Sequence, residues 1–387
     1  MRTHQTMPAE RAEIFSCAAY GRISPIKSTG DATCRRVTAI DLFCGAGGFS
    51  LAARNLGIHV LAALENDPNA CSSYRTYFSR FPSPPAMFEG DIRKISPEEM
   101  LAVLPKGGAP DILMGGPPCQ GFSSLRLKDS GVNDPRNELL IRYFDFVRAL
   151  RPTAFLVENV VGLLWPRHKQ HLEKFYAEAA SAGYDVCPPV VLNACDYGVP
   201  QRRKRVFILG WKDKMPCNPK WPPAPTHCNP ASPISGLTPW HPAAEAFLHP
   251  APQGDANDVH MNHGDALLEV FRSTPLNGGS RKDSCRVLPC HENHDGHKDV
   301  YGRIDPSKPA PTMTTACINP SKGRFLHPTE HHGITVRQAA RLQTFPDDFI
   351  FTGGLMSAAR QVGNAVPIRL GEAVLRSILS MLTDTRR

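Results

Sequence analysis

The chain has 387 residues, 41% of them hydrophobic and 21% charged, and this balance excludes wholesale disorder. Its 44 Lys and Arg residues outnumber its 36 Asp and Glu residues, so the net charge of +8 favours a polyanionic partner without establishing one. The first residues carry no signal-peptide pattern, and no apolar run reaches the roughly 18 residues of a membrane span, so we expect a cytoplasmic protein with no membrane partner and with free thiols.

Short apolar runs alternate with helical stretches from residue 37 to residue 211. Helices are expected at 51–56 and near 68–78. Strands are expected at 37–43, 59–66, 111–116, 153–159 and 205–211. Apolar strands separated by helices are typical of a doubly wound, mostly parallel α/β sheet with both faces covered.

The composition changes after Trp211. Eleven of the 37 prolines lie between Pro216 and Pro252, where neither a sheet interior nor a long helix is expected. A helical pattern returns at 335–345 and after Pro367. The domains predicted from these changes are a flexible extension at 1–36, a main domain at 37–212 plus 331–387, and a smaller loop-rich module at 213–330.

A glycine-rich turn follows the first predicted strand. Gly45 and Gly47 would let the backbone approach a ligand, although such a turn alone can also serve packing. The next two strands end near Glu65 and Asp91. Carboxylates at adjacent carboxyl ends of a parallel sheet face the cofactor crevice and can bind ribose hydroxyls or an amine, whereas the alternative is solvated charges at strand ends.

Cys119 follows the strand predicted at 111–116, in a loop stiffened by two prolines. A loop of this composition does not form a core, so Cys119 is a candidate nucleophile, whereas most of the other eleven cysteines are expected to be inert and buried. The polar loop after it contains Arg126 and Lys128, and it has the composition of a lid that closes over a phosphate backbone.

Charged residues lie at the ends of two further strands. Glu158 emerges from an apolar run, where partial burial would raise its pKa and let it carry a proton, unless it is a helix cap or a structural ion pair. Arg203 and Arg205 are spaced so that both point to one face of a strand. They could reach the active site, or they could belong to a solvated basic patch.

The segments DLFCGAGGFS, GGPPCQGFS, ENV, QRRKR, RLQTFPDDF and QVGNAVP follow one another along this chain. In sequence and in order they closely resemble the motifs of the DNA cytosine-5 methyltransferases, of the prokaryotic restriction-modification type. The resemblance covers roughly residues 37–211 and 300–375. It implies that the Pro-rich module at 213–330 is a target-recognition domain.

The resemblance also implies S-adenosyl-L-methionine as the cofactor and a Rossmann-like methyltransferase fold. Phe43 would stack near the adenine, Glu65 would hold the ribose, and Asn364 and Val366 would complete the methionine end. The remaining residues expected along the cofactor are Gly45, Gly47, Asn66, Asp91, Ile92 and Pro118.

The chemistry implied by the resemblance is addition of the Cys119 thiolate to carbon 6 of a flipped-out cytosine. Glu158 would contact ring nitrogen 3 and the exocyclic amine, Arg205 would bind the ring carbonyl oxygen, and Arg203 would orient the group. The implied partners are double-stranded DNA and a cognate restriction endonuclease acting on the same site, with the protein as a monomer. The expected DNA contacts are Gln120, Ser123, Arg126, Lys128 and Arg202.

Three other functions stay open at this point. A transfer RNA cytosine-5 methyltransferase shares the chemistry, a non-catalytic DNA-binding relative shares the fold, and a cysteine hydrolase would need a histidine that no motif supplies. No metal site is predicted. The residues Cys285, Cys290, His291, His294 and His297 lack the tight spacing of zinc knuckles and are interpreted as polar loop residues near phosphates. His332 departs from the arginine common at its position in the family.

Overall fold

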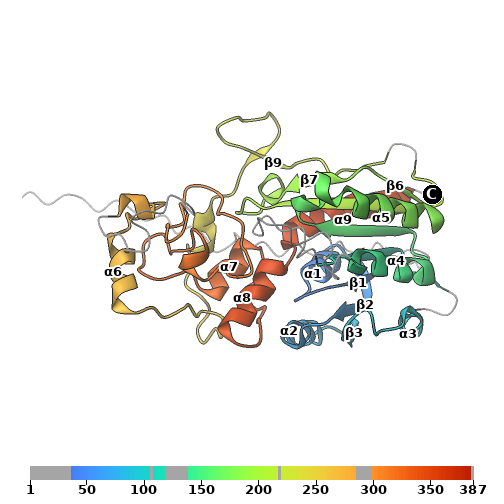
Figure 1. The fold of residues 1–387 in the computed structure, drawn as a ribbon, viewed down its shortest axis with the longest axis horizontal. Coiled ribbons are helices and arrows are strands. Elements are labelled where there is room, and N and C mark those ends of the chain that lie inside the picture. The colour runs from blue at the N-terminus through green and yellow to red at the C-terminus, as the bar shows by residue number, and fades with distance from the viewer. Residues whose placement is uncertain (1–35, 105–107, 119–137, 217–218, 285–298, 385–387) are drawn as a thin grey trace, which may run out of the picture. The chain divides into compact units, whose positions relative to one another are not determined.

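The computed structural model describes residues 36–104, 108–118, 138–216, 219–284 and 299–384, and all statements below concern these residues. Its centre is an eight-stranded sheet with the strand order β3-β2-β1-β4-β5-β8-β6, in which β7 also pairs with β8 (Figure 1). The strands of this sheet are β1 Thr38–Leu42, β2 His59–Glu65, β3 Ala86–Glu89, β4 Ile112–Gly115, β5 Ala154–Asn159, β6 Tyr184–Val186, β7 Val190–Asn193 and β8 Lys204–Lys212.

The first five strands run parallel to one another, which confirms the predicted mostly parallel α/β sheet. β8 runs antiparallel to β5, β6 and β7. The carboxyl end of β5 and the amino end of β8 therefore meet at the same edge of the sheet. The sequence pattern did not single out β6 and β7, because each is only three or four residues long.

The described helices are α1 Gly48–Asn55, α2 Pro68–Phe78, α3 Pro97–Leu101, α4 Glu138–Leu150, α5 Lys169–Ser181, α6 Asp265–Ser273, α7 Val336–Leu342, α8 Leu355–Asn364 and α9 Ile368–Asp384. Two of them begin at clear sequence signals. The Asp67 side chain accepts from two backbone N–H groups of α2, and Thr335 forms a capping box with Gln338 at the start of α7.

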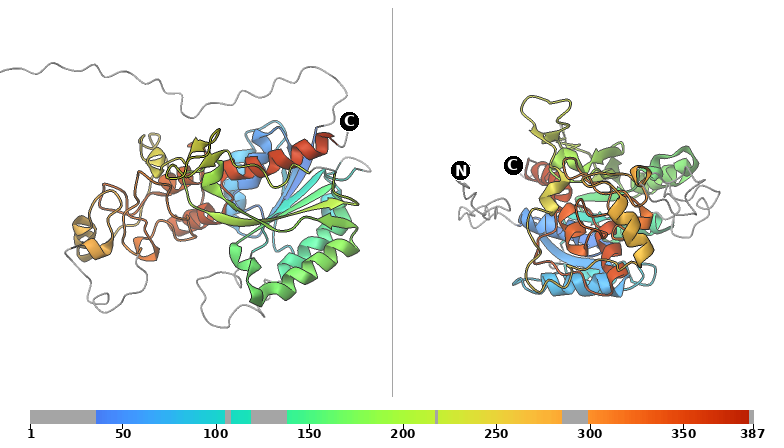
Figure 2. Two further views of the ribbon diagram at one scale, coloured as in Figure 1. Left: turned by 90° about the horizontal axis from the view of Figure 1, so that it is seen from above. Right: turned by 90° about the vertical axis from the view of Figure 1, so that its left-hand side faces the viewer.

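Alternate residues of each central strand enter two different hydrophobic cores. In β5, for example, Ala154 and Leu156 belong to one cluster, while Phe155 and Val157 belong to the other. Residues of α1 and α9 share the first cluster, and residues of α4 and α5 share the second. Figure 2 shows α9 over one face of the sheet and the green helices α4 and α5 over the other, so both faces are covered as predicted.

The segment 213–330 holds little regular structure in its described part. Besides α6 it contains the short strands β9 His227–Cys228 and β10 Thr238–Pro239. Ala243, Ile304 and Met313 pack into the cluster that also contains α1 and α9, whereas Phe271 belongs to a small cluster of its own.

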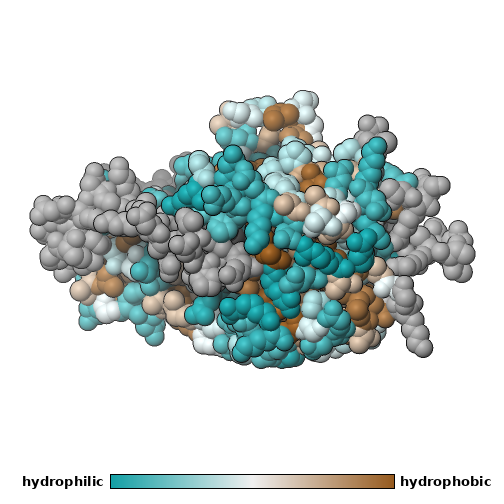
Figure 3. Space-filling model, turned by 45° about the vertical axis from the view of Figure 1, so that its right-hand side comes forward, coloured by the Kyte–Doolittle hydropathy of each residue, from teal (hydrophilic) through white to brown (hydrophobic). Residues whose placement is uncertain are grey.

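The described helices include none that is both long and apolar enough to cross a membrane. Figure 3 shows a face on which hydrophilic residues predominate and hydrophobic residues gather in small, separate patches.

Candidate active site

Glu158 and Arg205 form an ion pair at the carboxyl edge of the sheet. Glu158 is the penultimate residue of β5 and pairs in register with Phe207 of β8, so Arg205 lies on the same face two residues away. Arg205 Nε lies 3.0 Å from Glu158 Oε1, and both side chains are more than four-fifths buried. The strand face to which Arg203 and Arg205 are predicted to point is therefore the face that carries Glu158.

The surroundings of Glu158 favour its protonated form more than water does. Burial raises the pKa of this carboxyl, whereas the nearby guanidinium groups of Arg205 and Arg203 lower it. The net shift of the pKa is upward, as expected from burial, and the pair with Arg205 is also the structural ion pair that the sequence left open as the alternative. A carboxyl with this balance binds a proton more tightly than a carboxyl in water.

The loop that leads to Cys119 lies directly beside this ion pair. A side chain on Gly116 would meet Glu158 Oε2 at 3.3 Å, so the loop backbone runs against the carboxylate. Asn159 Nδ2 donates to the carbonyl oxygen of Pro117 at 3.3 Å and so fixes the end of the loop to β5. Pro118 is half-buried and is the last described residue of this segment. The predicted residues Cys119, Gln120, Ser123, Arg126 and Lys128 lie outside the described residues.

Arg203 is fully buried and ties together three remote segments. Its Nη1 donates to the carbonyl oxygen of Met313 at 2.8 Å, and its Nη2 donates to those of Gly363 and Ala365 at 2.8 and 3.1 Å. The guanidinium therefore joins the strand entry at 203–205 to the segment 213–330 and to the end of α8.

Two buried glutamines close this set of contacts. Gln201 accepts from the Met313 N–H at 2.8 Å and donates to Gln343 Oε1 at 2.9 Å. Gln343 in turn donates to the carbonyl oxygens of Val362 and Ala365 at 2.6 and 3.1 Å. Together with Arg203 they form a closed polar network around the start of β8. Sequence reasoning missed both glutamines, since a glutamine inside a basic or apolar run gives no sign of its partner.

The glycine-rich turn between β1 and α1 has a packed side and an open side. Gly47 has a φ of +98°, and a Cβ there would lie 2.8 Å from the rings of Tyr74 and Phe78. A Cβ on Gly48 would lie 2.4 Å from the carbonyl oxygen of Val366. Gly45, with φ +55°, faces open space instead. The packing interpretation therefore applies to Gly47 and Gly48, whereas Gly45 leaves space beside the backbone.

Glu65 organises the open side of this turn. Its Oε2 accepts from the Gly45 N–H at 2.9 Å, and its Oε1 accepts from the backbone N–H groups of Asn66 and Asp67 at 2.9 and 2.8 Å. The predicted residues Gly45, Glu65 and Asn66 are thus brought together. Burial raises the pKa of the Glu65 carboxyl, and these three hydrogen bonds oppose that rise.

The other predicted cofactor residues differ in how exposed they are. Phe43 is half-buried and holds a left-handed φ of 58°, a strained conformation for a residue with a side chain. Ile92 is buried in the core, and Asp91 forms an ion pair with Arg93 that lowers the pKa of Asp91 to about 2. Asn364 is exposed at the end of α8.

A buried carboxyl that the sequence reasoning passed over lies beneath the glycine turn. Asp41 of β1 accepts from the Ser50 hydroxyl at 2.7 Å, and Tyr74 donates to the same hydroxyl oxygen at 2.9 Å. Complete burial raises the pKa of Asp41 to about 7. An acidic residue inside the apolar run of a buried strand was the signal that could have revealed it.

The remaining predictions concern the basic patch and the cysteines. Arg202 is exposed, and its guanidinium carbon lies 5.8 Å from the centroid of the Trp240 ring. The described cysteines are free thiols, and burial raises the pKa of five of them: Cys44, Cys71, Cys187, Cys195 and Cys317. The Cys and His cluster at 285–297 lies outside the described residues, and the described residues contain no cluster of His, Cys, Asp or Glu suited to a metal.

Comparison with known proteins gives consistent similarities. Residues 37–380 match the family described as C-5 cytosine-specific DNA methylases. The chain is 34% identical to the Type II methyltransferase M1.HphI of Haemophilus parahaemolyticus, over 91% of this chain and 89% of that one. It is 32% identical to the Type II methyltransferase M.DdeI of Desulfomicrobium norvegicum, over 88% of each chain. A solved structure described as a DNA modification methyltransferase encoded within an E. coli prophage aligns with a TM-score of 0.63 and 25% identity, over 90% of this chain and 99% of that one.

Proposed function

Because this chain belongs to the family of C-5 cytosine-specific DNA methylases, we propose that it methylates carbon 5 of a cytosine that is flipped out of a specific duplex DNA sequence. The proposed methyl donor is S-adenosyl-L-methionine, and the proposed catalytic nucleophile is Cys119. The observation that carries the proposal is the buried Glu158–Arg205 pair beside the loop that leads to Cys119.

The residues around the glycine turn fit this cofactor. Gly45 faces open space, the Phe43 ring is half-exposed next to it, and Glu65 brings a carboxylate to the same edge. The ring suits an adenine, and the carboxylate suits the two hydroxyls of a ribose. The backbone of Val366 packs on Gly48, so the segment that follows Asn364 contacts the glycine turn. When bound, S-adenosyl-L-methionine supplies an electrophilic methyl group.

The reaction needs a nucleophile because carbon 5 of cytosine is electron-poor. In the proposed sequence the Cys119 thiolate adds to carbon 6 and forms a carbon–sulfur bond, which makes carbon 5 enamine-like and nucleophilic. After carbon 5 has accepted the methyl group it loses its proton, the carbon–sulfur bond breaks, and 5-methylcytosine and the thiolate are released. Because these positions are not accessible within stacked DNA, the base must leave the helix.

Glu158 and Arg205 are suited to hold the base during this addition. A protonated Glu158 donates to ring nitrogen 3, which draws electrons away from carbon 6 and favours attack there. Arg205 Nε faces Glu158 and Nη1 donates to the carbonyl oxygen of Lys204, and the remaining guanidinium donors suit the ring carbonyl oxygen. Arg203 acts as a positioning residue, because its guanidinium is committed to three backbone carbonyl groups.

The decisive experiment measures transfer of a labelled methyl group to duplex DNA and to transfer RNA. We expect incorporation into DNA and none into RNA, with loss of activity but retained DNA and cofactor binding in Cys119→Ser, because an alcohol adds poorly to carbon 6. A DNA duplex with 5-fluorocytosine at the target should trap the wild type covalently. Incorporation into RNA alone, or full activity of the serine variant, would contradict the proposal.

We also propose that residues 213–330 form the domain that selects the DNA sequence. In support, this segment contacts Arg203 through Met313, and most of its described part consists of loops, which can vary without disturbing the sheet. Exchanging 213–330 with the corresponding segment of a relative of different specificity should change the methylated sequence. A restriction endonuclease that cuts the same sequence is the partner expected in such a system.

A further inference from the structure

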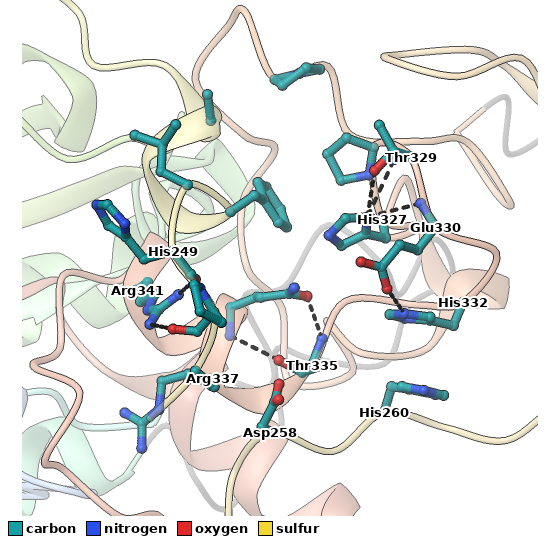
Figure 4. Close-up of a pocket in the computed structure, with 18 of the residues that line it drawn as sticks. His249, Asp258, His260, His327, Thr329, Glu330, His332, Thr335, Arg337 and Arg341 are labelled. Atoms are coloured by element: carbon teal, nitrogen blue, oxygen red, sulfur yellow. Dashed lines mark hydrogen bonds and ion pairs between the residues drawn. The ribbon is translucent and has the colours of Figure 1, made fainter. Parts of the chain in front are cut away.

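A cavity whose lining includes neither Glu158 nor Arg205 lies between the segments 244–260 and 327–341 (Figure 4). Its volume of about 750 Å³ is within the range of small-molecule and cofactor sites, roughly 300–1,000 Å³. Phe247, His260, His327, Glu330, His332 and Thr335 are among the residues that line it. None of these residues takes part in the reaction proposed above.

His327 presents a hydrogen-bond donor to this cavity. Its Nδ1 accepts from the backbone N–H groups of Thr329 and Glu330 at 3.3 and 3.0 Å, which places the ring proton on Nε2. Burial lowers the pKa of His327 to about 4, so the ring is neutral at neutral pH. Figure 4 shows the other ring nitrogen directed into the cavity, and no described protein atom forms a hydrogen bond with it.

An acceptor lies next to this donor. Glu330 Oε2 is 2.5 Å from His332 Nε2, and Figure 4 shows the second carboxylate oxygen of Glu330 directed into the cavity beside His327. The ring of His260 stacks on His332 with a centroid distance of 4.0 Å and an interplanar angle of 7°. Phe247 packs edge-to-face on His327 at 4.9 Å. The donor and the acceptor are thus framed by aromatic rings.

The two arginines that line the cavity are already engaged. Arg337 forms a two-point ion pair with Asp255, with N–O distances of 2.5 and 3.0 Å. Arg341 forms a similar pair with Asp347, at 2.8 and 2.7 Å. A phosphate would have to compete with these carboxylates and would also meet Glu330, so the cavity is suited to a neutral ligand.

We propose that this cavity binds a nucleobase, with the His327 Nε2–H donating to a ring oxygen or nitrogen and Glu330 accepting from adjacent N–H groups. Guanine fits best, because its N1–H and N2–H donors lie next to the acceptor O6. The base is either a guanine of the substrate DNA that has left its base pair, in which case the inference rests on the proposed function and makes His327 and Glu330 determinants of specificity, or a free nucleoside.

Two variants test the hydrogen-bond donor of His327 and the acceptor of Glu330 one at a time. His327→Asn removes the Nε2–H but retains a side-chain oxygen where Nδ1 accepts its hydrogen bonds. Glu330→Gln replaces the acceptor carboxylate with a neutral amide of the same length. His171→Asn, on α5, makes the first change at a histidine that does not line the cavity and serves as the matched control.

Binding of guanosine, adenosine, cytidine and thymidine to the full-length protein is measured by saturation-transfer NMR. We expect guanosine to bind best to the wild type and to His171→Asn, and its affinity to fall at least tenfold in His327→Asn and Glu330→Gln. This measurement needs no methyl transfer, so it remains informative if the protein does not methylate DNA.

Sequencing of methylated cytosines in DNA from expressing cells identifies the source of the base. Relaxed choice at one position of the recognition sequence in His327→Asn, with the same target cytosine, assigns the ligand to the DNA. An unchanged recognition sequence together with weakened guanosine binding assigns it to a free nucleoside. The proposal is overturned if His327→Asn and Glu330→Gln match the wild type in both measurements.

Discussion

Arg205 Nε and Glu158 Oε1 lie 3.0 Å apart because β8 runs antiparallel to β5. A parallel β8 would place its first residues at the opposite edge of the sheet, away from the end of β5. The antiparallel direction of β8 thus places the Arg205 guanidinium at the edge of the sheet where β5 ends and the loop toward Cys119 begins. The contribution of Glu158 to turnover can be measured by substituting this residue alone.

Replacing Glu158 with glutamine should abolish most turnover without weakening binding. The amide has the same size but cannot donate an acidic proton to the base, so we expect single-turnover methyl transfer to fall roughly 10²- to 10⁴-fold. Cofactor affinity, measured by calorimetry, should stay within twofold of the wild type. Glu173→Gln, an exposed position on α5, is the control. Turnover close to that of the wild type in Glu158→Gln would exclude Glu158 as the acid.

Adding a methyl group at Gly48 should separate the glycine turn from the segment after α8. The new Cβ would lie 2.4 Å from the Val366 carbonyl oxygen, and relief of such overpacking costs about 1–3 kcal/mol. We therefore expect Gly48→Ala to lower the free energy of unfolding in urea by that amount and to weaken cofactor binding. Gly264→Ala, where a Cβ meets nothing within 4 Å, should leave cofactor binding unchanged and should cost less stability, since it alters only the N-cap of α6. Unaltered cofactor binding in Gly48→Ala would show that this contact does not shape the site.

Substituting Gln343 with methionine should break the closed polar network at the start of β8. The methionine side chain would lose the hydrogen bonds to the carbonyl oxygens of Val362 and Ala365 and the one from Gln201, and each hydrogen bond contributes about 0.5–1.5 kcal/mol net. Urea unfolding should show this loss for Gln343→Met but not for Gln170→Met, which changes an exposed glutamine on α5. Equal stabilities of the two variants would mean that the network contributes nothing to the fold.

The buried carboxyl of Asp41 should make stability depend on pH. Its pKa is raised from 3.8 to about 7, so the native state binds the proton more tightly than the unfolded state does. The stabilisation is complete below pH 4 and is lost as the pH rises through about 7. At 1.36 kcal/mol per pKa unit, the shift corresponds to at most about 4 kcal/mol.

Asp41→Asn removes this titration while keeping an oxygen that can accept from Ser50. Unfolding free energies measured at pH 5 and pH 8.5 should therefore fall more steeply for the wild type than for the variant. Parallel pH dependences of the two proteins would show that Asp41 does not titrate in this range.

Local sequence signals determined the long central strands, the starts of two helices and the chemistry of individual residues. The apolar run around Ala39 specifies a buried strand, and Asp67 and Thr335 specify the starts of α2 and α7, because these preferences depend only on near neighbours. The glycine turn and the position of Glu158 after an apolar run are local in the same way. The motif order added the resemblance to the methyltransferase family, which the comparisons confirmed.

Only the tertiary structure decided which of these residues meet. The direction of β8 follows from its pairing with β5, and that pairing sets Arg205 against Glu158. The contact of Gly48 with Val366 and the three carbonyl partners of Arg203 join segments far apart in the chain. Such contacts depend on how buried faces pack and on how buried donors find acceptors, which no local pattern encodes. The neutral His327 beside Glu330 is likewise a product of packing, since the sequence shows only another histidine in a polar loop.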